Sequence, residues 1–117
     1  MIYVLEDDDG IRGLFQVILE DHGYVVELFP SVETFKQGIL NAVPDLVIMD
    51  IWLPDGDGRA VCRELRKQVS TAEIPILMMT AQYGVGKIEG ASDFISKPFD
   101  ISDLIDRVEK LLSSVQT

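Results

Sequence analysis

The sequence contains a single cysteine, Cys62, and no long apolar run. A lone cysteine excludes an internal disulfide and fits a reducing compartment, so we expect a cytoplasmic protein. A membrane-spanning helix needs about 20 consecutive apolar residues, and no segment approaches that length. Acidic residues follow directly after residues 1–5, so we also expect no secretory signal.

Positively charged residues are scarce as well. The chain has 10 Lys and Arg against 20 Asp and Glu, which gives a formal net charge of −10. This charge repels nucleic-acid phosphates and anionic lipid surfaces, and it favours cations and basic protein surfaces as partners. The length of 117 residues and the hydrophobic content of 47% suit one domain, residues 1–117, with a true core.

Short apolar runs alternate with segments of helical periodicity. The runs that we predict as strands are residues 2–5, 24–28, 46–49, 76–79 and 94–96. The first helix is expected to end at His22 and Gly23, and Ser31 and Asp100 are expected to cap later helices. The apolar face predicted for the helix after the third strand extends to Val69.

This alternation predicts an α/β fold with a parallel sheet covered on both faces. Five strands favour the flavodoxin-like doubly wound order 2-1-3-4-5, in which ligands bind at the carboxyl ends of the strands. Glu6 and Asp7 follow the first strand, and Asp50 follows the third. Those two strands are neighbours in this order, so we expect the three carboxylates to converge. Thr80 and Lys97 follow the fourth and fifth strands at the same edge.

Clustered carboxylates resist ionising together, and a hard divalent cation removes that difficulty. Mg²⁺ prefers such oxygen ligands, and Mn²⁺ is an alternative. A cation and Lys97 would also neutralise the charge of an incoming phosphoryl group, which Asp50 could accept as an acyl phosphate. Thr80 could donate a hydrogen bond to a phosphoryl oxygen.

The segments VLEDD, DLVIMDIWLPDGDG, ILMMTA and FISKPF occur in this order. Together they resemble the response-regulator receiver domains of two-component systems. The resemblance implies that Asp50 is the phosphoacceptor and that Asp7 is a metal ligand. It implies that Glu6 acts through the water shell of the metal, and that Trp52 supplies a backbone carbonyl to it.

The resemblance also assigns the switch hydroxyl to Thr80, the conserved lysine to Lys97 and the aromatic switch residue to Phe94. It implies a histidine kinase or histidine phosphotransfer protein as phosphodonor and a downstream protein partner of unknown identity. The protein would be a monomer or weak dimer. It would be no enzyme beyond catalysing its own phosphorylation and dephosphorylation.

The segment between Thr80 and Lys97 departs from the family pattern, because it is short and rich in glycine. Each of Gly84, Gly86 and Gly90 disfavours a helix by about 1 kcal/mol relative to alanine. We therefore predict that the helix between the fourth and fifth strands is missing or reduced to a single turn within residues 82–92. Residues 82–90 would instead form a loop whose order changes on phosphorylation.

Other interpretations of these residues remain. An acidic run such as residues 6–9 can simply begin a helix, with Asp8 or Asp9 as its cap. An aspartyl-phosphate hydrolase would need a carboxylate where Trp52 stands. A flavodoxin-like electron carrier would bind phosphate where the acidic run repels it. A degenerate receiver that binds partners without phosphorylation is disfavoured, since every expected site residue is present.

Overall fold

A computed structural model describes residues 1–80 and 88–114. The central strands are β1 (Ile2–Leu5), β2 (Val26–Phe29), β3 (Leu46–Asp50), β6 (Ile76–Thr80) and β7 (Asp93–Ser96). The helices are α1 (Asp9–Asp21), α2 (Val32–Asn41), α3 (Gly58–Lys67) and α4 (Ile101–Ser114). Two short strands, β4 (Trp52–Leu53) and β5 (Gly56–Asp57), form a separate hairpin.

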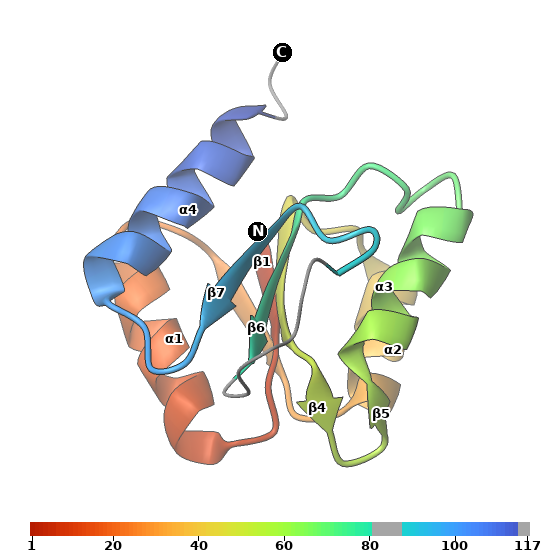
Figure 1. Cartoon of the computed structure of the whole chain (residues 1–117), viewed down its shortest axis with the longest axis horizontal. Helices are drawn as coiled ribbons and strands as arrows, with labels where there is room; N and C mark the ends of the chain where they lie inside the picture. The colour runs from red at the N-terminus through yellow and green to blue at the C-terminus, as the bar shows by residue number, and fades with distance from the viewer. Residues whose placement is uncertain (81–87, 115–117) are drawn as a thin grey trace.

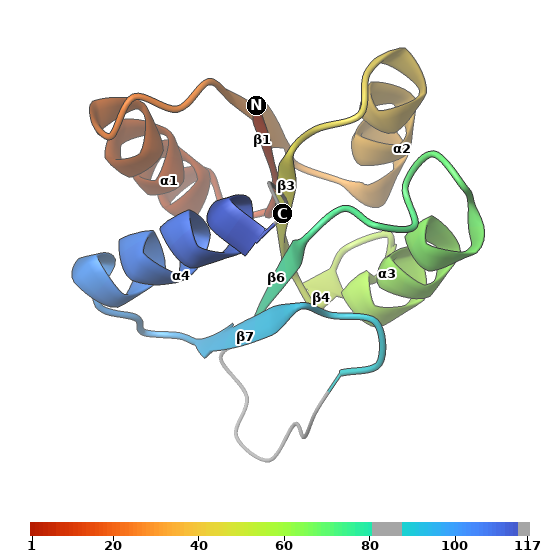
Figure 2. The ribbon, with the colours of Figure 1, turned by 90° about the horizontal axis from the view of Figure 1, so that it is seen from above.

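The five central strands are all parallel and lie in the order β2-β1-β3-β6-β7. Helices α1 and α4 cover one face of the sheet, and α2 and α3 cover the other (Figure 2). This confirms the predicted flavodoxin-like doubly wound fold. This order is the expected 2-1-3-4-5, because the two hairpin strands are numbered β4 and β5 and the fourth and fifth strands of the sheet are therefore β6 and β7.

Local capping fixes where three helices begin. Asp8 accepts a hydrogen bond from the N–H of Ile11 at 2.9 Å, which confirms one of the two predicted caps of α1. Ser31 forms a capping box with Thr34 at the start of α2. Asp100 accepts the N–H of Ser102 at 2.9 Å as α4 begins. Each cap satisfies an N–H group that the helix itself leaves free.

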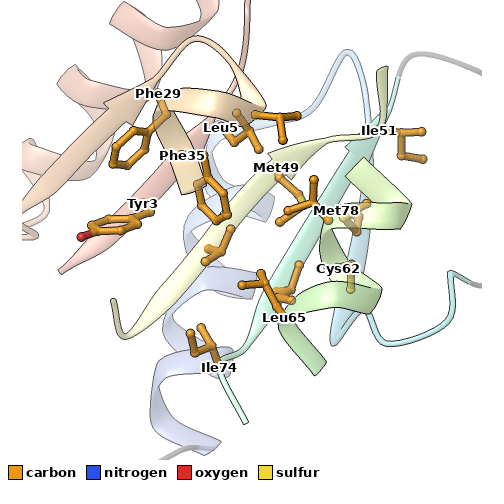
Figure 3. Close-up of a cluster of buried hydrophobic side chains, with 14 of the residues drawn as sticks. Tyr3, Leu5, Phe29, Phe35, Met49, Ile51, Cys62, Leu65, Ile74 and Met78 are labelled. Carbon is orange, nitrogen blue, oxygen red and sulfur yellow. The ribbon is translucent and has the colours of Figure 1, made fainter. Parts of the chain in front are cut away.

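The core consists of one apolar cluster on each face of the sheet. On the side of α2 and α3, the rings of Tyr3, Phe29 and Phe35 meet edge to face, as Figure 3 shows. Cys62 is fully buried in this cluster, and burial raises the pKa of its thiol. It is therefore an inert core residue, as its place on an apolar helical face indicates.

Two sequence-based expectations need correction. The second strand begins at Val26 rather than at residue 24. The helix before β6 ends at Lys67, and Val69 beyond it is 98% exposed, so Val69 is no part of an apolar face. In both cases the apolar pattern extends beyond the hydrogen-bonded element.

The described part of the β6–β7 connection, residues 88–92, contains no helix. The rest of the predicted loop, up to residue 87, lies outside the described residues. None of the helices in the described ranges is long and apolar enough to cross a membrane.

Gly38 provides a test of the core packing. A Cβ at this position would lie 2.5 Å from two ring carbons of Phe29. We expect Gly38→Ala to lower the free energy of unfolding by about 1–3 kcal/mol, because overpacking forces the ring to move. At Gly13 in α1, a Cβ meets nothing within 4 Å. Gly13→Ala should therefore raise stability by about 0.5–1 kcal/mol. Denaturant unfolding measures both, and equal effects would contradict this packing.

Candidate functional site

Three carboxylates meet at the carboxyl edge of the sheet. Glu6, Asp7 and Asp50 each offer an oxygen, and these oxygens lie within 4.8 Å of one another. Glu6 and Asp50 are buried, whereas Asp7 is exposed. They come together because β1 and β3 are paired neighbours that end at the same level. The structure thus brings together the acids that the sequence predicts.

Lys97 supplies the opposing charge. Its Nζ donates hydrogen bonds of 2.6 Å to both Glu6 Oε1 and Asp50 Oδ2. Burial alone would lower the pKa of Lys97, but these two carboxylates outweigh it and raise the pKa. Lys97 therefore remains a cation at the centre of the site. The peptide bond between Lys97 and Pro98 is cis.

Glu6 is buried at the edge of the sheet. Burial raises the pKa of its carboxyl group to about 7, against the lowering effect of Lys97. Its second oxygen, Oε2, accepts the N–H of Asp7 at 2.9 Å. Glu6 is thus held at both oxygens, and its contact with Lys97 is direct.

Trp52 lies next to Asp50 at the start of the β4–β5 hairpin. Its backbone N–H donates to Asp50 Oδ1 at 3.1 Å, so both oxygens of Asp50 are engaged. Trp52 is 45% exposed, and the guanidinium of Arg59 lies over its indole ring, 5.0 Å from the ring centroid.

The two predicted switch residues lie on the neighbouring strands. Thr80 is fully buried at the carboxyl end of β6, and its carbonyl accepts the N–H of Lys97 at 2.8 Å. Phe94 lies in β7, is partly buried, and packs against the cluster beneath α2 and α3. Thr80 therefore adjoins the strand ends that carry the acids and the lysine, whereas Phe94 lies further back in the sheet, level with Met78 of β6.

The donor set fits a hard divalent cation, because it consists of carboxylate oxygens from two adjacent strand ends. One of these acids, Asp7, faces solvent, which suits a metal such as Mg²⁺ that keeps several waters. Two of the three acids already share Lys97, so the site combines an acid cluster that could hold a metal ion with a fixed ammonium group.

Comparison with known proteins points to one family. The model of the response regulator receiver domain matches residues 2–109. The chain belongs to the response regulator receiver domain family. It is 38% identical over 121 residues to the DNA-binding dual master transcriptional regulator RpaA of Synechocystis sp., covering 95% of this chain and 48% of that protein. The chain spans about half the length of the curated relatives that it matches.

Two solved structures share the fold. The signal receiver domain of a histidine kinase from Syntrophus aciditrophicus superposes with a TM-score of 0.89 at 32% identity, covering 97% of this chain and 90% of that one. The receiver domain of a sensor histidine kinase from Pseudomonas aeruginosa has a TM-score of 0.87 at 26% identity, covering 96% of both chains. That structure has a magnesium ion coordinated in its active-site cleft.

Sequence reasoning missed a residue that shapes this receiver domain. Arg12 of α1 donates from Nη1 to the carbonyl oxygens of Glu6 and Asp7, at 2.9 and 2.8 Å, and it also pairs with Asp9. It therefore fixes the backbone that carries the two acids. Helical spacing places Arg12 one turn after Asp8, but nothing in the pattern indicates contact with carbonyl groups.

Gly58 is a second residue that shapes the site and that sequence reasoning missed. A Cβ there would overlap the backbone oxygen of Asp50, and the N–H of Gly58 donates to Ile51 O at 2.7 Å. Only glycine allows this close approach of α3 to the end of β3. The preceding residue, Asp57, caps α3, since its Oδ1 accepts the N–H of Arg59 at 2.8 Å.

Substitution of Arg12 tests its role. Arg12→Met leaves two loop carbonyls without their donor, so we expect the free energy of unfolding to fall by about 1–3 kcal/mol. Arg63 in α3 is exposed and makes no hydrogen bond or ion pair with the described residues. Arg63→Met should therefore change stability by less than about 0.5 kcal/mol. Chemical denaturation of both variants decides the matter, and equal losses would refute the role of Arg12.

Proposed function

We propose that this receiver domain accepts a phosphoryl group on Asp50 from a phosphohistidine donor. The observation that carries the proposal is the placement of Asp50. Its Oδ2 lies 2.6 Å from Lys97 Nζ, and its carboxylate stands within the cluster formed with Glu6 and Asp7. A carboxylate nucleophile beside a fixed ammonium and a metal-binding acid cluster is the arrangement that phosphoryl transfer to an aspartate requires.

In the proposed reaction, an oxygen of Asp50 attacks the phosphorus atom and forms the acyl phosphate bond. The bond from phosphorus to the histidine nitrogen breaks, and its electron pair returns to the imidazole. Lys97 neutralises part of the charge that builds up on the phosphoryl oxygens. Because Lys97 is already bonded to Asp50, it needs little reorganisation to do so.

We assign a Mg²⁺ site to Asp7, Asp50 and the backbone carbonyl of Trp52, with Glu6 acting through the water shell. When bound, the cation would neutralise charge shared by the phosphoryl oxygens and the acids. The donor chemistry of the acid cluster supports this assignment, as does the magnesium ion in the related domain from Pseudomonas aeruginosa.

For the response, we propose that Thr80 binds a phosphoryl oxygen and that Phe94 changes its packing with it. The proposed phosphodonor is a histidine kinase or histidine phosphotransfer protein, and the recipient of the signal is a further protein. We place these events in the cytoplasm, consistent with the buried free thiol of Cys62. Residues 1–117 would act as one domain that turns over no separate substrate.

Mass spectrometry tests the central step. Incubation with acetyl phosphate and Mg²⁺ should add the mass of one phosphoryl group to the wild-type protein. Asp50→Asn should gain none, because an amide cannot form the acyl phosphate. Asp106→Asn makes the same change at an exposed position in α4, and this control should still be modified. A wild type without mass gain would refute the proposal.

Trp52 offers a probe of the metal site, since it is the only tryptophan and its N–H contacts Asp50. We expect Mg²⁺ to change its fluorescence saturably. Asp7→Asn should weaken this binding by about tenfold or more, because it removes a proposed ligand. Asp8→Asn removes a neighbouring charge but keeps a cap for α1, so its effect should stay below about threefold. Similar losses in both variants would argue against Asp7 as a ligand.

A further inference from the structure

Asp55 has no role in the proposed chemistry, yet it makes a contact that joins two distant parts of the chain. Its Oδ1 accepts the N–H of Val32 at 2.9 Å, and its Oδ2 accepts the N–H of Glu33 at 3.1 Å. These are the first two residues of α2, whose third N–H, that of Thr34, is bonded by Ser31. The free N–H groups of α2 are thus shared between a local cap and a remote one.

The place of Asp55 in the loop gives this contact a further consequence. Strands β4 and β5 pair Trp52 with Asp57 and Leu53 with Gly56, so Asp55 lies in the turn at the tip of the hairpin. Figure 1 shows this hairpin at the lower edge of the sheet, where the central strands end. At its base, the N–H of Trp52 donates to Asp50. The hairpin therefore spans from the site to the first turn of α2.

A hairpin of two-residue strands cannot hold its own shape, since even longer isolated hairpins are marginally stable in water. Its position depends on the anchors at its two ends. The tip also packs closely on α2, because a Cβ at Gly56 would lie 3.1 Å from Val32 Cγ2. The N–H of Val32 lowers the pKa of Asp55, so the anchoring group is a carboxylate at neutral pH.

We propose that Asp55 is a positioning residue for the metal site. By tying the tip of the β4–β5 hairpin to α2, it holds the backbone of Trp52 in the position from which its carbonyl serves the cation. The inference rests on the proposed function, because it takes the Trp52 carbonyl as a ligand. It goes further in making the affinity for Mg²⁺ depend on a contact at the far end of the hairpin.

Three variants separate this role from simple helix capping and from charge. Asp55→Ala removes the tether. Ser31→Ala removes the other cap of α2 and leaves the tether in place. Glu33→Gln removes one exposed negative charge from the same helix turn, and the side chain of Glu33 makes no hydrogen bond or ion pair with the described residues. Calorimetric titration with Mg²⁺ alone gives the affinity without relying on the surroundings of Trp52.

We expect Asp55→Ala to weaken Mg²⁺ binding by about tenfold, the lower end of the loss seen when supporting groups of a metal site are removed. Ser31→Ala and Glu33→Gln should change it by less than about twofold, although Ser31→Ala lowers thermal stability as a lost cap does. In the absence of metal, hydrogen exchange at the amides of Trp52 and Asp57 should become faster in Asp55→Ala and stay unchanged in Ser31→Ala.

The outcomes are distinguishable. A wild type that does not bind Mg²⁺ overturns the proposed metal site and this inference with it. A wild type that binds, together with unchanged affinity in Asp55→Ala, overturns the inference alone. Equal losses in Asp55→Ala and Ser31→Ala also overturn it, because the stability of α2 would then account for the effect. Equal losses of affinity in Asp55→Ala and Glu33→Gln would overturn it too, because the loss of one negative charge would then account for the effect.

Discussion

Lys97, which follows β7, links the ends of two further strands. Its Nζ lies 2.6 Å from both Glu6, which follows β1, and Asp50, at the end of β3. A chain with a net charge of −10 places three carboxylates side by side here, and their repulsion opposes the fold unless a cation compensates. Lys97 can do so only from the end of β7, by reaching across β6. The charge balance of the site therefore depends on the strand order, because a different order would separate the ammonium group of Lys97 from the acids.

This constraint explains why the sequence predicts so much of the fold and of the site. Parallel strands have their carboxyl ends at one edge, so any polar group directly after a predicted strand belongs there. Glu6, Asp7, Asp50 and Lys97 all follow from that rule, and the structure brings them together. The rule needs the strand order but not the strand boundaries. The second strand could thus be placed two residues too early without harm to the predicted site.

Contacts between loops could not be predicted in the same way. The β4–β5 hairpin has strands of two residues, too short for any alternation of apolar and polar positions to reveal it. The contact between Asp55 and α2 joins residues 23 positions apart and depends on how that hairpin folds back. Sequence reasoning assigned Lys97 to a phosphoryl group. Its bond to Glu6 was not foreseen, because it depends on the burial of that acid.

The side chains that hold the loops are distinct from those proposed for the chemistry. Arg12 binds the carbonyls of Glu6 and Asp7, and Arg66 of α3 binds those of Ala72, Ile74 and Gly90. Such carbonyls lie outside regular structure and need partners from elsewhere. Through Arg66, the described end of the β6–β7 connection is bonded to α3. Ile88 and Phe94 pack into the cluster on that same side. A rearrangement that moved the ring of Phe94 would thus act on the cluster beneath α2 and α3. The backbone of Phe94 is bonded on the other side of the sheet, because its carbonyl accepts a hydrogen bond from Arg107 of α4 at 2.9 Å.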